Sequence, residues 1–213
     1  VFGVALLAWI RLGVPGAAGT PRGAQLAIRA VRPRPGLRPV LRVAGLNVLA
    51  HTSLYTDVAV HLAHLGQGSR TSALLLVLGA ASAGARALVA ALTAHRLRAL
   101  TLGSVVVFAL AMLVLGLAPT STVVVVLAVA AWGAAFGGAG TLYTTAAARA
   151  AGDGADVAQS ALVTVWNTSV ALGGAVGGAA LAVAGPGGLP WVSLALMVPV
   201  LAPVARGRRP SFR

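Results

Sequence analysis

The stretch that decides the fold is residues 99–148, ALTLGSVVVFALAMLVLGLAPTSTVVVVLAVAAWGAAFGGAGTLYTTAAA. It lies between Arg98 and Arg149, and none of its fifty residues is Asp, Glu, Lys or Arg. A helix that crosses a membrane needs about 20 apolar residues. The stretch is therefore long enough for two crossings, and the Pro119 segment between its halves marks the connection.

The same pattern continues on both sides of this stretch. A second charge-free stretch of forty-nine residues lies between Asp156 and Arg206 and is interrupted at Pro186. Upstream, two further apolar segments carry one charge each, Asp57 in the first and Arg86 in the second. The sequence therefore predicts six membrane spans, at about 43–65, 71–94, 99–118, 122–147, 157–184 and 189–205.

The composition of the 213-residue chain agrees with a membrane protein. Hydrophobic residues make up 58% of the chain and charged residues only 9%, against roughly 25% in an ordinary soluble domain. This excludes a water-soluble globular protein, and it excludes a disordered chain, which needs low hydrophobicity. The chain has no Cys, which excludes disulfides and thiolate metal sites, and we expect neither a metal site nor a cofactor.

The arginines predict the orientation of the spans. Thirteen of the sixteen fall in segments that the six spans place on one side of the membrane, whereas Arg70 is alone on the other side. By the positive-inside rule the Arg-rich side is cytoplasmic, so both ends of the six-helix unit face the cytoplasm. Because the arginines follow the topology and form no single basic face, we expect no nucleic-acid partner.

The beginning of the chain indicates a fragment of a longer protein. Residues 1–10 are apolar and Arg11 follows them, as at the end of a truncated transmembrane helix. We therefore expect four parts: the end of a truncated helix at 1–11, a basic cytoplasmic linker at 12–41, a six-helix transmembrane domain at 42–206 and a cytoplasmic tail at 207–213.

Three motifs occur in order along the spans. The first is His51-Thr52-Ser53-Leu54-Tyr55-Thr56, and the second is Trp132-Gly133 with a glycine-rich run through Gly140. The third is Ala161-Leu162 with Trp166-Asn167-Thr168-Ser169-Val170-Ala171-Leu172-Gly173-Gly174. The first resembles the His-Phe-x-x-Tyr/Phe-Thr pattern of the drug/sugar-efflux permease group of the major facilitator superfamily, and the third its Ala-Leu…Phe-Asn-Leu-Gly-x-Ala-Leu-Gly pattern. The chain departs from that group at Asp57, where an aromatic residue is usual, at Val60, where Pro is frequent, and at His95-Arg96, where an acidic–Arg pair is usual.

The resemblance implies an all-α membrane protein, with six transmembrane helices forming the C-terminal half of a twelve-helix major facilitator fold. It implies a secondary active efflux permease of a bacterial cytoplasmic membrane, an antiporter that moves small organic compounds by alternating access and not an enzyme. Its partners would be the small-molecule substrate, protons, the lipid bilayer and the missing N-terminal six-helix half. Two alternatives stay open: a self-contained six-span channel or scaffold protein, and an intramembrane enzyme that uses Asp57, His61 and His64.

Seven residues are candidates for the substrate or proton pathway: Asp57, His61, His51, Tyr55, Arg86, Trp132 and Asn167. At 100° per residue, Asp57, His61 and His64 share one helix face, and an intramembrane carboxylate usually faces a cavity or a partner. This face is open to three interpretations: a protonatable site, a cation-attracting vestibule or a solvated polar stripe. Arg86 either snorkels to the interface, lines the cavity as an anion-attracting group or pairs across helices.

Small residues predict where the helices pack closely. In the fifth span Ser160, Thr164, Asn167, Ala171, Gly174 and Gly178 share one face, with Gly173 and Gly177 beside it, and the fourth span contributes Gly133 and Gly137. Asn167 is the member of this face expected to reach the cavity. We expect Tyr143 to anchor the fourth span at the membrane interface.

Overall fold

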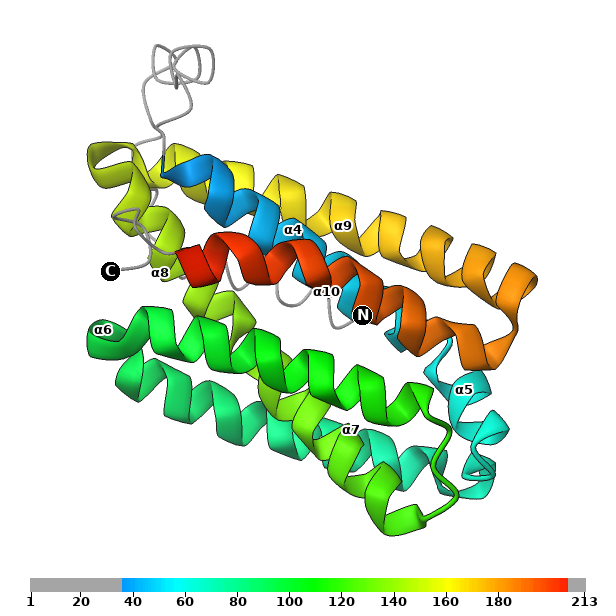
Figure 1. Cartoon of the computed structure of the whole chain (residues 1–213). Helices are drawn as coiled ribbons and strands as arrows, with labels where there is room; N and C mark the ends of the chain where they lie inside the picture. Colours follow the sequence, from blue (N-terminus) through cyan, green and yellow to red (C-terminus); the bar gives the residue numbers. More distant parts are fainter. Residues whose placement is uncertain (1–35, 207–213) are drawn as a thin grey trace, which may run out of the picture. The chain divides into compact units, whose positions relative to one another are not determined.

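The computed structural model describes residues 36–206, with side chains described as far as Val200, and this part is all-helical and contains no strand. The predicted all-α class is confirmed. The expected truncated helix at 1–11, most of the expected linker and the tail at 207–213 lie outside the described residues. The elements in chain order (Figure 1) are α4 Leu37–Tyr55, α5 Val58–His64, η1 Gly68–Arg70, α6 Thr71–Gly116, α7 Thr122–Gly137, α8 Ala139–Ala151, η2 Gly152–Gly154, α9 Ala155–Ala184, η3 Pro186–Gly188 and α10 Leu189–Arg206.

Two helical stretches of the described residues are long and apolar enough to cross a membrane. They are Gly68–Gly116 and Thr122–Ala184, and Pro186–Val200 forms a shorter apolar helix. Each long stretch greatly exceeds the roughly 20 residues of one crossing, and each is interrupted within its length. The count of six membrane spans stays a prediction.

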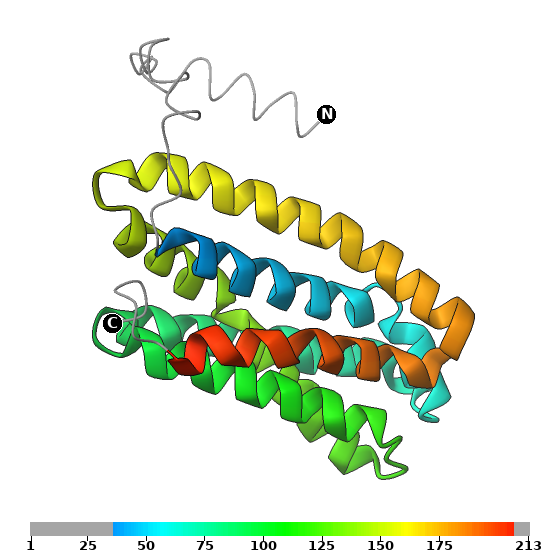
Figure 2. The same cartoon turned by 45° about the horizontal axis from the view of Figure 1, so that its top comes forward.

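The interruption in the first stretch is a reversal at Arg96. This residue has non-helical backbone angles, φ −130° and ψ 25°, inside the 46 residues of α6. Both Figure 1 and Figure 2 show the two halves of α6 lying side by side, one before Arg96 and one after it. The expected spans at 71–94 and 99–118 therefore form a hairpin that reverses within the predicted connection at 95–98.

Two of the predicted spans are each divided into two helices. The segment expected at 43–65 forms α4 and α5, because Asp57 takes the non-helical angles φ −111° and ψ 22°, and α4 begins at Leu37, before the predicted start. The segment expected at 122–147 forms α7 and α8, which meet at Gly138. The last two expected spans, at 157–184 and 189–205, coincide with α9 and α10 within two residues at each end.

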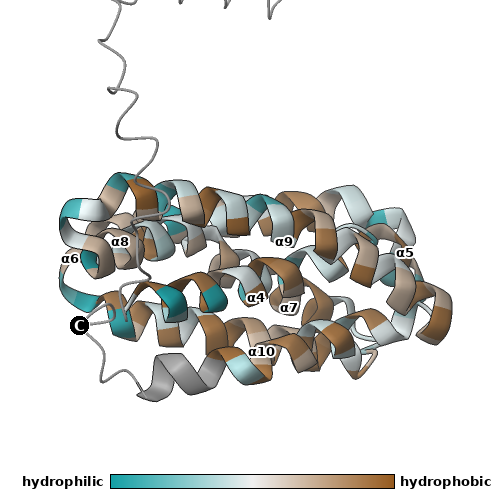
Figure 3. Cartoon of the chain, turned by 90° about the horizontal axis from the view of Figure 1, so that it is seen from above, coloured by the Kyte–Doolittle hydropathy of each residue, from teal (hydrophilic) through white to brown (hydrophobic). Residues whose placement is uncertain are grey.

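The Arg-rich connections lie together at one end of the helical bundle. The start of α4, the reversal of α6 and the connection from α8 to α9 share this end, while η1, η3 and residues 117–121 lie at the opposite end (Figures 1 and 2). Figure 3 shows that strongly hydrophilic residues gather at the first end. At that end Arg149 Nη2 of α8 donates to the Ala94 carbonyl of α6 at 2.8 Å.

Glycines let two pairs of helices approach at backbone contact. A methyl group at Gly133 or Gly137 of α7 would overlap the backbone of α6, and one at Gly177 of α9 would overlap the Ser53 carbonyl of α4. Gly173 has the same close approach to α4. The glycine Gly178 differs from the expectation, because a methyl group there would meet no atom within 4 Å.

Candidate functional site

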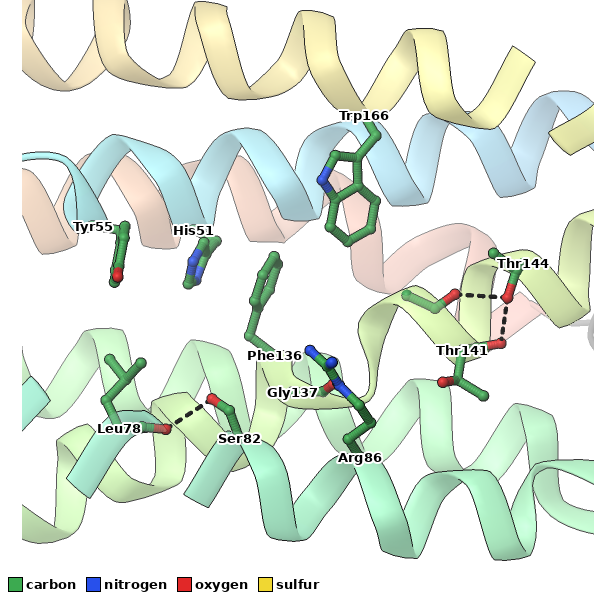
Figure 4. Close-up of a pocket in the computed structure, with 11 residues that line it drawn as sticks. His51, Tyr55, Leu78, Ser82, Arg86, Phe136, Gly137, Thr141, Thr144 and Trp166 are labelled. Carbon is green, nitrogen blue, oxygen red and sulfur yellow. Dashed lines mark hydrogen bonds between the residues drawn. The ribbon is translucent and has the colours of Figure 1, made fainter. Parts of the chain in front are cut away.

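The described residues line an open cavity of about 670 Å³ between α4, α6, α7, α8 and α9 (Figure 4). Its volume is in the range of pockets that hold small organic molecules. Three of the predicted pathway residues line it: His51, Tyr55 and Arg86. The other lining residues are Leu78, Ser82, Phe136, Gly137, Gly140, Thr141, Thr144 and Trp166.

The helices contribute these residues at a spacing of four. His51 and Tyr55 come from α4, and Ser82 and Arg86 come from α6. Residues four apart lie one above the other on a helix face, so each helix offers one row to the cavity. Further members of these rows are Leu78 on α6 and Phe136, Gly140 and Thr144 along α7 and α8.

Aromatic rings form a continuous row along one wall, as Figure 4 shows. The His51 ring stacks on Phe136 with centroids 3.5 Å apart and planes 2° apart, and it stacks on Tyr55 at 5.2 Å. Phe136 in turn lies 5.9 Å from Trp166 in a tilted arrangement. The row therefore joins side chains of three helices, α4, α7 and α9.

Trp132 supports this row from behind and does not line the cavity. It is fully buried, and its Nε1 donates a hydrogen bond to His51 Nδ1 at 3.0 Å. The indole N–H can only donate, so Nδ1 must be the accepting nitrogen of a neutral imidazole. The ring proton of His51 therefore resides on Nε2.

Arg86 crosses from α6 toward α7 at the floor of the cavity. Its Nε donates to the Gly137 carbonyl at 3.4 Å, which is a long hydrogen bond, and the side chain is exposed. One turn earlier, Ser82 Oγ lies 2.8 Å from the Leu78 carbonyl and 2.9 Å from the Gly133 carbonyl. Backbone contacts thus hold this part of α6 against α7.

A smaller pocket of about 220 Å³ adjoins the cavity and contains Asn167, another predicted pathway residue. The two spaces share Gly140, Thr144 and Trp166. The smaller pocket is otherwise lined by Leu162 and Val163 of α9. Its surface is apolar apart from a few polar atoms, so it suits a hydrocarbon or aromatic group.

The structure separates Asp57 and His61 from the cavity, and neither residue lines it. His61 is buried, and its Nδ1–H donates to the Pro186 carbonyl at 2.9 Å, which ties α5 to η3. Within the described residues, His61 Nε2 and Asp57 Oδ2 are buried without a hydrogen-bond partner. His64 is exposed, with its ring 6.3 Å from that of His61, and the described residues contain no group of three side chains that could hold a metal ion.

Tyr143 is buried inside the bundle and does not reach its surface, as the predicted interfacial anchor would. Its side chain is 1% exposed, and its hydroxyl accepts a hydrogen bond from the Asn47 side-chain amide of α4. An anchoring tyrosine would keep its hydroxyl at the water boundary. The pair instead joins α8 to α4 through two buried polar groups.

Sequence reasoning missed Ser82, Phe136 and Trp166 as lining residues. A signal for them existed, because Ser82 precedes Arg86 by four residues, Phe136 follows Trp132 by four, and Trp166 is next to Asn167. Applying the spacing of four to the predicted pathway residues would have found the first two.

The comparisons with known proteins identify no relative. The chain matches no protein-family model, and no curated protein is significantly similar to it.

Proposed function

We propose that this protein is a secondary active transporter of the efflux permease type, which moves small organic compounds across a bacterial cytoplasmic membrane by alternating access. In this proposal its six helical segments form the C-terminal half of a twelve-helix major facilitator fold, and a second six-helix half completes the central cavity. The observation that carries the proposal is the cavity of about 670 Å³ with its row of aromatic rings and one arginine. Such a mixture of apolar walls and few polar groups is typical of sites for small organic ligands.

The arrangement of the connections supports the proposed topology. The Arg-rich connections gather at one end of the bundle, which is the cytoplasmic end if the positive-inside rule applies. Close packing through Gly137 and Gly177 brings helices of this half together at backbone contact. A tightly packed half suits alternating access, in which one half rocks against the other around a central site.

Asp57 and His61 are the proposed groups for proton coupling. Each has a buried side-chain atom without a partner among the described residues, and such atoms are rare in folded proteins unless a function requires them. Asp57 lies at the break between α4 and α5, His61 lies one turn later in α5, and its bond to Pro186 reaches the connection between α9 and α10. A proton bound or released here would change the charge at the contact between α4, α5 and η3.

Transport by the full-length protein in proteoliposomes tests the proposal. A panel of small organic compounds is offered with and without an imposed proton gradient, and at least one compound is expected to move faster with the gradient. Empty liposomes are the control for leakage. No gradient-dependent movement of any compound would count against a transporter and favour a channel or scaffold.

The variant Asp57→Asn separates coupling from binding. It removes the ionisable group and keeps the shape of the side chain, so substrate binding in the cavity is expected to persist while the pH dependence of transport changes. An unchanged pH profile of transport would contradict the proposed role of Asp57, without bearing on the cavity.

A further inference from the structure

The part of the cavity that residues 36–200 line carries one formal charge, and that charge is positive. Of the eleven residues that line it in the described part of the chain, Arg86 alone is charged. The carboxylate of Asp57 lies outside the lining, at the break before α5, and Asp153 and Asp156 lie in η2 and at the start of α9. No carboxylate among the lining residues neutralises the guanidinium.

Most of the hydrogen-bonding capacity of Arg86 is unused. A guanidinium has five N–H donors in a planar fork, and the described residues engage only Nε, through the 3.4 Å bond to Gly137. The donors on the two Nη atoms are left for a ligand. Their fixed geometry matches the two oxygens of a carboxylate or another oxyanion, which binds such a fork through two parallel hydrogen bonds.

His51 adds a neutral donor to the same cavity. Because Nδ1 accepts from Trp132, the proton on Nε2 is the remaining polar group of the ring. Protonation of Nδ1 would place two N–H groups against each other and break this bond. His51 is therefore held as a hydrogen-bond donor, which suits an acceptor on the ligand and not a cation.

A place for an apolar group adjoins the cavity that Arg86 lines. The smaller pocket shares Gly140, Thr144 and Trp166 with the cavity, and a methyl group at Gly140 would meet no atom within 4 Å. Trp166 borders both spaces and offers its ring to them. An anionic group at Arg86 could therefore continue into a flat apolar ring packed against Trp166 (Figure 4).

We infer that the cavity selects organic anions, and specifically small aromatic carboxylates, with the carboxylate on Arg86 and the ring against Trp166. This inference rests on the proposed function because it names the substrate class of the same site. An organic cation is disfavoured, because it would meet the Arg86 charge and no lining carboxylate.

Binding of three matched probes to the full-length protein in lipid nanodiscs tests the inference. The probes are 2-naphthoate, 2-naphthylmethanol and protonated 2-naphthylmethylamine, which share one ring system and differ in charge. Isothermal titration calorimetry, corrected with empty nanodiscs, is expected to give at least tenfold tighter binding for the anion than for either other probe. Equal or tighter binding of the cation or the alcohol would overturn the inference.

Two pairs of variants locate the binding. Arg86→Gln is expected to weaken 2-naphthoate binding by about ten- to a hundredfold, as the loss of a charged hydrogen-bond pair implies. Arg70→Gln removes the same charge in η1 and is expected to change nothing. Gly140→Leu would close the passage to the smaller pocket and weaken binding at least tenfold, whereas Gly103→Leu, which also faces open space, would not.

An Arg86→Gln protein that binds 2-naphthoate as tightly as the wild type would overturn the assignment of Arg86. Unchanged binding in Gly140→Leu would overturn the placement of the ring. If Arg86→Gln does not fold, the comparison of the three probes on the wild type decides alone. Because the measurement is of binding, anion selectivity without any transport would contradict the proposed function and leave this inference standing.

Discussion

Polar side chains inside this bundle are tied in pairs that join neighbouring helices. Trp132 donates a hydrogen bond to His51, which links α7 to α4. Asn47 donates a hydrogen bond to Tyr143, which links α4 to α8. Buried polar groups cost free energy unless they are paired, and a completed pair specifies one arrangement of its helices. These two pairs therefore position α4, which carries the aromatic row of the cavity.

The substitution Tyr143→Phe tests the second pair. It would leave the Asn47 amide buried without an acceptor, which is expected to lower the free energy of unfolding by about 1–3 kcal/mol. The measurement is thermal unfolding of the purified protein in detergent. Tyr55→Phe is the matched control, because Tyr55 is 45% exposed and its hydroxyl has no hydrogen bond among the described residues. Equal stability of Tyr143→Phe and wild type would contradict the buried pair.

The approximate positions of the helices could be predicted from the length of the stretches between charged residues. Long charge-free stretches and the prolines at Pro119 and Pro186 located α9 and α10 closely. The reversal at Arg96 falls in the connection that the sequence predicts between 94 and 99, whereas the breaks at Asp57 and Gly138 were not predicted. Hydrophobicity cannot reveal them, because an apolar helix stays apolar on either side of a local change in backbone angles.

The inward faces of the helices were harder to predict than the helices. In a soluble helix the polar face points to water and the apolar face to the core. In an apolar helix for a membrane, lipid and protein neighbours are equally apolar, so the pattern does not separate the two faces. Of the glycines of α9 that were predicted to pack, Gly173 and Gly177 lie against the backbone of α4, whereas Gly178 faces open space.

Adjacent glycines of α9 give a sharp test of this packing. Gly177→Ala would force the new methyl group against the Ser53 carbonyl, and overpacking of this kind is expected to cost about 1–3 kcal/mol of stability. Gly178→Ala has open space and is expected to be neutral or to stabilise by up to about 1 kcal/mol, since alanine favours a helix. Thermal unfolding of both variants is the measurement. Similar effects of the two substitutions would contradict the orientation of α9.

For the whole molecule, the question is how often the chain crosses the membrane. A straight helix of 46 residues would be about 69 Å long at 1.5 Å per residue, more than twice the roughly 30 Å of a hydrocarbon core. The reversal at Arg96 divides α6 into two segments, each close to the length of one crossing. Six crossings follow if α4 with α5, each half of α6, α7 with α8, α9 and α10 each cross the bilayer once, and both ends of the bundle then lie in water.

The absence of cysteine from the chain makes this topology directly testable. Single substitutions Ser69→Cys, Thr120→Cys and Asp153→Cys place one thiol in three connections, all at exposed positions. With six crossings, Ser69 and Thr120 lie on the same outer side, because the chain crosses twice between them. Both are expected to react with a membrane-impermeant maleimide in intact cells, whereas Asp153→Cys should react only after permeabilisation.

Fewer crossings predict a different labelling pattern. If each of the two long apolar stretches crossed once, Ser69 and Thr120 would lie on opposite sides, and Asp153 would lie within the second stretch. Labelling of Ser69→Cys without Thr120→Cys in intact cells would therefore contradict the six-span arrangement, and with it the transporter half-fold. The protein without these substitutions gives the background of the measurement, to which residues 1–213 contribute no thiol. Because the readout is accessibility alone, it tests the topology independently of any substrate.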